Sequence, residues 1–78
     1  MESDCLSALK PMQTATITEV LLHGADRRRV YDLGFQPGSH VRCTHLGPGG
    51  SPVAFLVNSA QIALRESVCR QILAVVHG

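Results

Sequence analysis

One stretch of the sequence decides how this chain folds: Arg27-Arg28-Arg29-Val30-Tyr31-Asp32-Leu33-Gly34-Phe35-Gln36-Pro37-Gly38. Asp26, directly before it, is a good N-cap, because its carboxylate can accept a hydrogen bond from a backbone N–H that has no partner inside the helix. Gly34 can adopt the left-handed conformation that ends a helix. Pro37 and Gly38 suit the two central positions of a type II turn. The stretch therefore predicts a helix of about two turns from residue 26 to 33, a tight reversal and then a strand.

Short segments rich in β-branched and apolar residues surround this stretch and are typical of strands. They cover residues 15–22, 40–46, 53–57, 62–64 and 73–76. In the first, alternation is expected to place Ala15, Ile17 and Leu21 on one face and Val20 on the other. The sequence therefore predicts five strands.

Turns and short helices separate the strands. Residues 47–52 form a Gly- and Pro-rich loop, and Asn58-Ser59 makes a short reversal. Residues 65–71 have helical spacing, and residues 3–9 are expected to form one helical turn, capped by Ser3 or Asp4, that closes one end of the fold. Short strands punctuated by Gly and Pro favour a mainly β fold, a small five-stranded antiparallel barrel with two or three short helices, because closure removes exposed strand edges.

The composition indicates one globular domain over residues 1–78. Apolar residues make up 45% of the chain and charged residues only 17%, which favours a packed interior over disorder. The longest apolar runs are far shorter than the roughly 20 residues that span a bilayer as a helix, and the acidic start at Met1-Glu2 is unlike a signal peptide. Cys5, Cys43 and Cys69 are odd in number and widely spaced, which is unlike a disulfide framework, so a cytoplasmic location is expected.

The motif Arg29-Val30-x-x-Leu33-Gly34-Phe35-x-Pro37-Gly38 resembles the central motif of the FeoA proteins of bacterial ferrous iron transport. The resemblance extends over nearly the whole chain, from Leu6-Ser7-x-Leu9-Lys10-Pro11 to the apolar run that ends at Val76. Three positions differ from the family pattern. Met12 and the pair Asn58-Ser59 stand where the family usually has turn glycines, and Ser51 stands in place of an aspartate before a proline.

The FeoA resemblance implies an SH3-like barrel and a cytoplasmic accessory protein. It also implies a partner, FeoB, which is a membrane permease with a cytoplasmic GTPase domain. The chain would then reach the membrane only through that partner. The alternative function is a metal-responsive regulatory barrel that binds a transition metal directly, because domains resembling FeoA also occur at the C-terminus of metal-dependent repressors.

The sequence contains none of the motifs that commonly mark an active site. It has no nucleophile elbow, no His-Glu-x-x-His and no phosphate-binding loop, so a non-enzymatic function is expected. Nucleic-acid binding is not expected either. The formal net charge is only +1, and Lys10, Arg42, Arg65 and Arg70 are scattered along the chain, whereas non-specific binding uses on the order of 6 to 10 phosphate contacts.

The candidate metal ligands are incomplete. Cys43 and His45 lie two residues apart on one face of the predicted strand, so their side chains could converge on one ion. A structural site normally needs four ligands, and His23, His40 and His77 would have to be brought there by the fold. The ligand set is therefore left unassigned and no cofactor is expected, with a transition metal such as Fe(II) or Zn(II) as the alternative.

The arginine triplet is the strongest candidate for a partner-binding surface. Arg27, Arg28 and Arg29 occupy the first helical turn, where the positive end of the helix dipole disfavours cations. Ion pairs with Asp26 and Asp32 would offset this and leave an ordinary solvated face.

The predicted contact surface combines the triplet with two aromatic residues and the glycine-rich loop. Its members are Arg27, Arg28, Arg29, Tyr31, Phe35, Gly49 and Gly50. For the oligomeric state, both a monomer and a weak homodimer remain open.

Overall fold

A computed structural model describes residues 3–77, so the acidic start at Met1-Glu2 lies outside the described residues. The elements follow one another as β1 (Asp4–Cys5), η1 (Leu6–Ala8, a 3-10 turn), β2 (Thr14–Val20), α1 (Gly24–Leu33), β3 (His40–Leu46), η2 (Pro48–Gly50, a 3-10 turn), β4 (Val53–Val57), β5 (Ala60–Leu64), α2 (Glu66–Cys69) and β6 (Ile72–His77). The predicted mainly β fold is confirmed.

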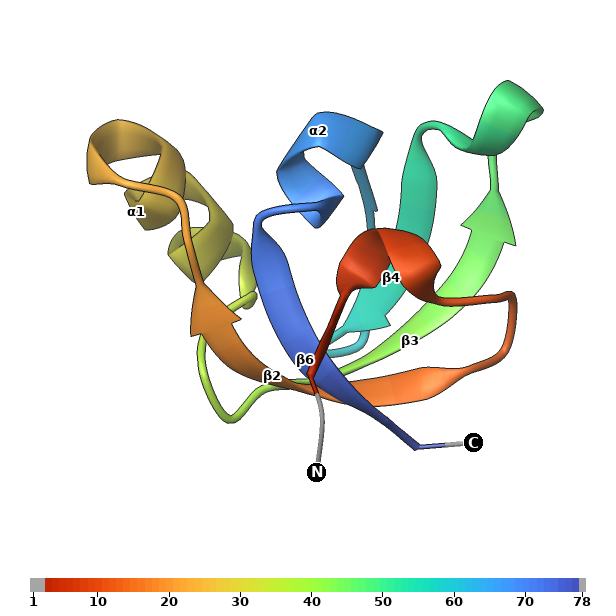
Figure 1. Cartoon of the computed structure of the whole chain (residues 1–78), viewed down its shortest axis with the longest axis horizontal. Helices are drawn as coiled ribbons and strands as arrows, with labels where there is room; N and C mark the ends of the chain where they lie inside the picture. The colour runs from red at the N-terminus through yellow and green to blue at the C-terminus, as the bar shows by residue number, and fades with distance from the viewer. Residues whose placement is uncertain (1–2, 78) are drawn as a thin grey trace.

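All six strands belong to one antiparallel sheet in the order β1-β6-β2-β3-β4-β5. The sheet curls on itself as an SH3-like barrel does, and β1 and β5 form its two ends (Figure 1). The predicted count of five strands was one too low, because β1 pairs only two residues with β6 and is too short to show a periodicity.

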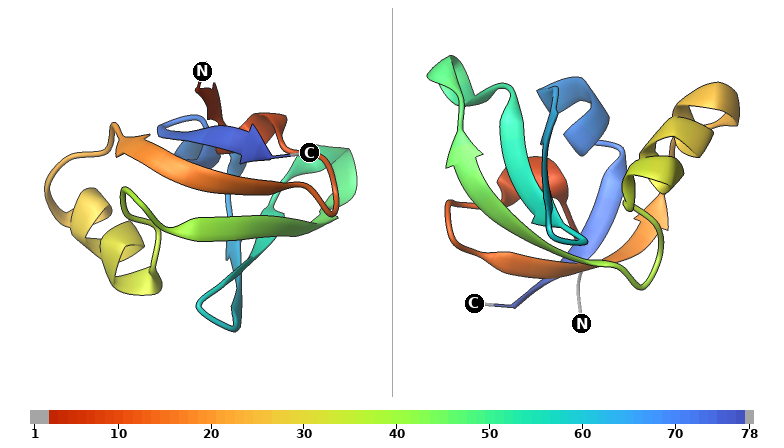
Figure 2. Two further views of the ribbon diagram at one scale, coloured as in Figure 1. Left: turned by 90° about the horizontal axis from the view of Figure 1, so that it is seen from below. Right: turned by 180° about the vertical axis from the view of Figure 1, so that it is seen from behind.

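The helices and the η2 turn stand along one rim of the curled sheet. In Figure 1, α1 and η2 lie at opposite ends of this rim and α2 lies between them. The view from behind in Figure 2 shows the same order. This arrangement decides which surface residues can meet a common partner.

Helix α1 begins two residues before the predicted start. The N-cap is His23, whose carbonyl accepts the first helical hydrogen bond from the Arg27 N–H at 3.4 Å, so the prediction of Asp26 as the cap was wrong. Asp26 instead lies in the first turn, where its charge is favourable beside the helix dipole. The predicted end is confirmed, since Gly34 has φ 108° and the Phe35 N–H donates to the Val30 carbonyl at 2.8 Å.

The turn after α1 also follows the prediction. Gly38 has φ 93°, and the Ser39 N–H donates to the Gln36 carbonyl at 2.9 Å. The chain therefore reverses at Pro37-Gly38 and enters β3, as a turn with glycine in its third position requires.

A β-bulge in β2 reverses the predicted faces at the end of that strand. The pairing with β6 shifts register between Ile17 and Glu19. Ala15 and Ile17 are buried as predicted, but Val20 is also buried and Leu21 is 40% exposed. The extra residue at the bulge turns the following side chains to the opposite faces, so the prediction for Val20 and Leu21 was wrong.

The first helical turn is present but shorter than residues 3–9, and it is not capped as predicted. Its N-cap is Cys5, without a side-chain hydrogen bond, while Ser3 Oγ lies 3.1 Å from Thr18 Oγ1. The turn nevertheless carries Leu6 and Leu9 into the core.

Helix α2 falls within the predicted residues 65–71 and begins with help from a distant loop. Its N-cap, Arg65, makes no capping hydrogen bond through its side chain. The Glu66 N–H instead donates to Ser51 Oγ at 3.2 Å. Ser51 therefore supplies an oxygen acceptor at the place where the FeoA pattern has an aspartate.

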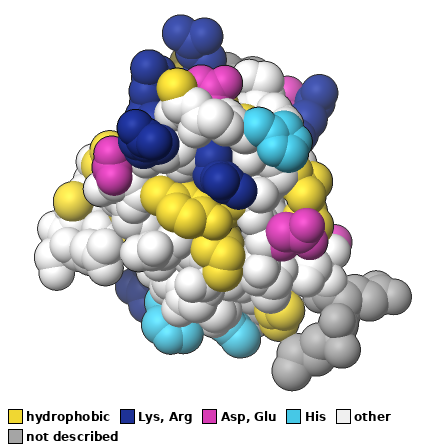
Figure 3. All heavy atoms as spheres, turned by 90° about the vertical axis from the view of Figure 1, so that its left-hand side faces the viewer, with side chains coloured by type: hydrophobic (Ala, Val, Ile, Leu, Met, Phe, Trp, Pro, Cys, Tyr) yellow, Lys and Arg dark blue, Asp and Glu magenta, His cyan; other side chains and the backbone are white. Residues whose placement is uncertain are grey.

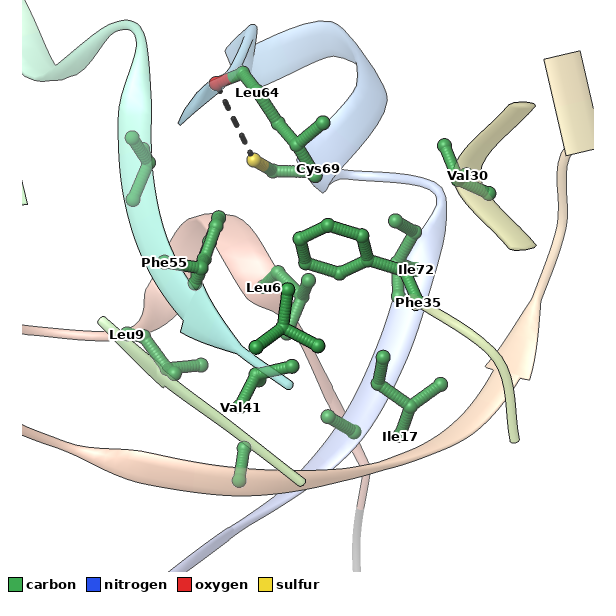
Figure 4. Packing of buried hydrophobic residues seen from close by; sticks show 14 of the residues in the cluster. Leu6, Leu9, Ile17, Val30, Phe35, Val41, Phe55, Leu64, Cys69 and Ile72 are labelled. Carbon is green, nitrogen blue, oxygen red and sulfur yellow. Dashed lines mark hydrogen bonds between the residues drawn. The ribbon is translucent and has the colours of Figure 1, made fainter. Parts of the chain in front are cut away.

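The core is one cluster of aliphatic, aromatic and cysteine side chains (Figure 4). They come from strands β2 to β6, from both α-helices and from the η1 turn. Phe35 and Phe55 lie at its centre with 0% exposure, and their ring centroids are 5.8 Å apart in an edge-to-face arrangement. Leu6 and Ile72 are equally buried. The segment after α1 is therefore fixed to the sheet by Phe35.

Two of the three departures from the family pattern place ordinary residues in a glycine conformation. Met12 has φ 76°, and Asn58 and Ser59 have φ 50° and 65°, as a two-residue hairpin turn of type I′ requires. The reversal at Asn58-Ser59 is therefore confirmed.

Replacing Met12 with glycine is expected to stabilise the protein by about 0.5–1 kcal/mol, because relief of the left-handed strain exceeds the entropy that glycine adds to the unfolded chain. Met12 is 64% exposed, so little packing is lost. Lys10→Gly is the control and should destabilise, since Lys10 does not have a positive φ. Urea unfolding measures both, and a loss of stability in Met12→Gly would contradict the assignment of strain.

Candidate functional site

The arginine triplet is exposed, and within the described residues it forms none of the ion pairs that a solvated face would use. Within residues 3–77 the one salt bridge joins Arg70 to Glu66 at 3.0 Å. The pairs considered from the sequence, with Asp26 and Asp32, are therefore not formed. Arg27 instead places its guanidinium 5.9 Å from the centroid of the Tyr31 ring, at cation–π range.

Phe35 does not belong to any contact surface, so that part of the sequence prediction was wrong. The left-handed turn at Gly34 directs the chain inward, and the Phe35 ring packs against Phe55 with 0% exposure. A partner could reach it only if the core opened.

The remaining predicted contacts lie in two separate places. Arg27, Arg28, Arg29 and Tyr31 are on α1, whereas Gly49 and Gly50 are in η2 at the other end of the rim (Figures 1 and 2). Helix α2 stands between them, so these residues do not form one continuous patch.

A groove lies between α1 and the β5–α2 segment, with a cavity volume of about 460 Å³. Apolar side chains supply much of its surface, and polar side chains surround them. The lining consists of Leu22, Asp26, Arg29, Val30, Leu33, Ala63, Leu64, Arg65, Ser67, Val68 and Gln71. A mixed lining of this kind is typical of a binding groove.

Two arginines line this groove from opposite sides. Arg29 comes from α1 and Arg65 from the end of β5, and neither is in an ion pair within the part of the chain that the structure describes. Asp26 is the one acidic residue in the lining. On the side of the molecule that Figure 3 presents, apolar surface is likewise flanked by Lys and Arg side chains. The groove thus favours an apolar ligand that carries negative charge.

The end of α1 contacts the β4–β5 turn. A Cβ atom added to Gly34 would lie 2.6 Å from Asn58 Nδ2 and 3.0 Å from Val57 Cγ2. The helix end and the hairpin therefore touch at Gly34.

The proposed metal pair on β3 does not form. The pairing of β3 with β4 shifts register between Cys43 and His45, so Cys43 is buried while His45 is exposed. Burial raises the pKa of the Cys43 thiol, and it raises the pKa of Cys69 to about 12, which keeps both thiols neutral. Residues 3–77 hold no group of three or more His, Cys, Asp and Glu side chains placed to bind a metal ion.

The fold instead brings together two other histidines. Thr16 Oγ1 on β2 lies 2.9 Å from His40 Nδ1 on β3 and 2.7 Å from His77 Nε2 on β6. All three side chains lie on one exposed side of the sheet. His40 and His77 were among the candidate ligands, but their position beside Thr16 could not be predicted from the sequence, because β6 and β3 become neighbours of β2 only through the sheet order.

No helix in residues 3–77 is both long and apolar enough to cross a membrane.

The chain is an SH3-like β domain. Its features are a curled sheet, short helices on one rim and a groove beside the edge strand β5. The FeoA domain model matches residues 5–76, and this chain belongs to the FeoA family. The members of this family are non-catalytic accessory domains of ferrous iron transport.

Two solved FeoA proteins are similar in both sequence and structure. FeoA from Stenotrophomonas maltophilia, solved as a zinc complex and described as an SH3 domain protein, is 33% identical with a TM-score of 0.77, and the match covers 91% of this chain and 88% of that one. FeoA from Chlorobium tepidum is 32% identical with a TM-score of 0.82, covering 94% and 68%.

IdeR from T. acidophilum shows the same fold at lower identity. It is 20% identical with a TM-score of 0.84, and the match covers 99% of this chain but only 35% of that one. This likeness concerns the fold alone. No curated protein matches the chain.

Proposed function

We propose that this protein acts in ferrous iron uptake as a non-enzymatic module that binds a FeoB-type permease in the cytoplasm. The observation that carries the proposal is the groove between α1 and β5–α2, which offers apolar surface together with Arg29 and Arg65. Membership of the FeoA family supports a role in ferrous iron uptake. The protein would reach the membrane only through its partner.

The proposed contact surface differs from the one expected from the sequence. Arg29 remains in it and Arg65 joins it, because the fold places the two on opposite sides of the groove. Arg27, Arg28 and Tyr31 form the adjacent outer side of α1. Gly49 and Gly50 would touch only a partner large enough to reach past α2.

The double variant Arg29→Ala/Arg65→Ala tests the groove. Its affinity for the cytoplasmic GTPase domain of FeoB from the same organism is expected to fall at least about tenfold, since interface arginines are frequent hot spots. Lys10→Ala/Arg42→Ala removes the same charge outside the groove lining and should leave the affinity within about twofold. Equal losses in the two double variants would show that only overall charge matters.

A second candidate function, direct binding of a transition metal, is favoured by His40, Thr16 and His77. Two imidazole nitrogens from different strands converge on one hydroxyl, and imidazole is a ligand for Zn(II), Fe(II), Ni(II) and Cu(II). Two histidines leave coordination positions for water or for a group from another molecule. The exposed Arg42 on the same strand as His40 opposes cation binding and would keep the affinity modest.

Zinc titrations of single histidine variants, monitored by NMR, test whether the protein binds a transition metal directly. His40→Ala and His77→Ala should each weaken zinc binding at least about tenfold. Loss of a residue that only hydrogen-bonds to a metal ligand already lowers metal affinity by about that much, so loss of a ligand should lower it at least as far. His23→Ala and His45→Ala remove the two histidines outside the cluster and should change nothing. Equal effects at all four positions would indicate unspecific surface binding, and the candidate would be rejected.

A further inference from the structure

Strand β5 is an edge strand of the sheet, and among residues 3–77 only its edge toward β4 is paired. It pairs with β4 without a register shift, from Val57↔Ala60 at the turn to Val53↔Leu64 at the far end. Residues flanking a two-residue hairpin turn exchange hydrogen bonds, and the pairs then alternate along an antiparallel ladder. The backbone groups of residues 60, 62 and 64 therefore face β4.

By the same alternation, the N–H and C=O groups of Gln61 and Ala63 face away from β4. Within residues 3–77 no strand lies beyond β5, and neither residue makes a backbone hydrogen bond in a turn or loop. Both residues are exposed. The edge thus presents two backbone N–H donors and two backbone C=O acceptors, positioned to pair with a further strand.

This edge borders the groove described above. Ala63, Leu64 and Arg65 line the groove consecutively, and α1 forms the opposite wall. A ligand strand paired with β5 would have α1 on its other side. Along such a strand, alternate side chains would face the apolar surface around Leu33 and Val68.

The charges of the groove select among extended ligands. Arg29 and Arg65 are without ion pairs in the described residues, and Asp26 is the one acid in the lining. A segment with a carboxylate beside its apolar side chains would therefore be preferred over a basic one.

We propose that an extended, acidic and apolar segment of the partner adds as a strand to the free edge of β5 and lies in the groove between α1 and α2. The inference rests on the proposed function, because the partner is the permease. It specifies how the groove is used: backbone hydrogen bonds at Gln61 and Ala63 provide affinity, and the two arginines provide selectivity.

Two substitutions at Ala63 separate the backbone from the side chain. Ala63→Pro removes an N–H that faces away from β4, which edge strands tolerate. It is expected to weaken binding of the FeoB GTPase domain at least about tenfold. Ala63→Ser keeps the N–H, so its loss of affinity should be clearly smaller than that of Ala63→Pro. A folded Ala63→Pro protein that binds normally would overturn strand addition and leave the proposed function intact.

Amide hydrogen exchange of the unmodified protein gives an independent readout if Ala63→Pro fails to fold. The amides of Gln61 and Ala63 should exchange rapidly in the free protein and become protected when the GTPase domain is added. Protection at α1 alone would overturn strand addition. Protection that grows with concentration in the absence of the GTPase domain would assign the edge to a second copy of this chain and overturn the choice of occupant. No binding by the unmodified protein would reject the proposed function, and this inference with it.

Discussion

Replacing Phe35 with alanine is expected to lower the free energy of unfolding by about 3–5 kcal/mol, because the ring is fully buried and its removal leaves a cavity against Phe55. A domain of this size has a total stability of roughly 4–12 kcal/mol, so the variant should be largely destabilised and difficult to produce. Urea unfolding monitored by circular dichroism measures the effect.

Leu56→Ala is the control for the Phe35 variant. Leu56 is 41% exposed on β4, and its truncation should cost less than about 1 kcal/mol. If Phe35→Ala kept its stability and lost only the binding of the permease, Phe35 would return to the contact surface where the sequence had placed it.

Replacing Gly34 with alanine is expected to cost about 2–3 kcal/mol. Two effects combine at this position. A side chain is strained at φ 108°, and the added Cβ would press on Val57 Cγ2 at 3.0 Å and on Asn58 Nδ2 at 2.6 Å. Thermal and urea unfolding both report the loss.

Gly38→Ala separates the two effects at Gly34. Gly38 also has a positive φ, 93°, but an added Cβ would meet no atom within 4 Å, so only conformational strain applies, at about 1–2 kcal/mol. Equal destabilisation by the two variants would contradict the close contact of Gly34 with the β4–β5 turn.

The features that the sequence predicts well are local ones. Short runs of β-branched and apolar residues identified β3 and β4, and Gly34 and Pro37-Gly38 identified the helix end and the turn, because each of these depends on the conformational preferences of a few neighbouring residues. The reversal at Asn58-Ser59 was likewise predicted from the turn preferences of these residues, although neither is a glycine.

The failures in placing side chains on the surface or in the core depend on contacts between distant residues. A bulge changes which face a side chain occupies without changing the residue pattern, and this overturned the predictions for Val20 and for the pair Cys43 and His45. Phe35 was predicted to lie on the contact surface, but it packs against Phe55, which only the folding of the sheet brings next to it.

The candidate sites show the same limit. From the sequence, Arg65 was one of several scattered basic residues, and only the packing of β5 and α2 beside α1 places it across a groove from Arg29. His40 and His77 meet because β3 and β6 both flank β2, which no spacing along the chain reveals.

The most direct test of partner binding is a titration of the unmodified protein with the cytoplasmic GTPase domain of FeoB from the same organism, with and without guanine nucleotide. NMR of the labelled protein reports both affinity and location. We predict saturable binding with chemical-shift changes confined to α1, β5 and α2, the elements that line the groove. Saturable changes centred on any other surface, or none at all, would contradict the assignment of this groove as the site for the permease.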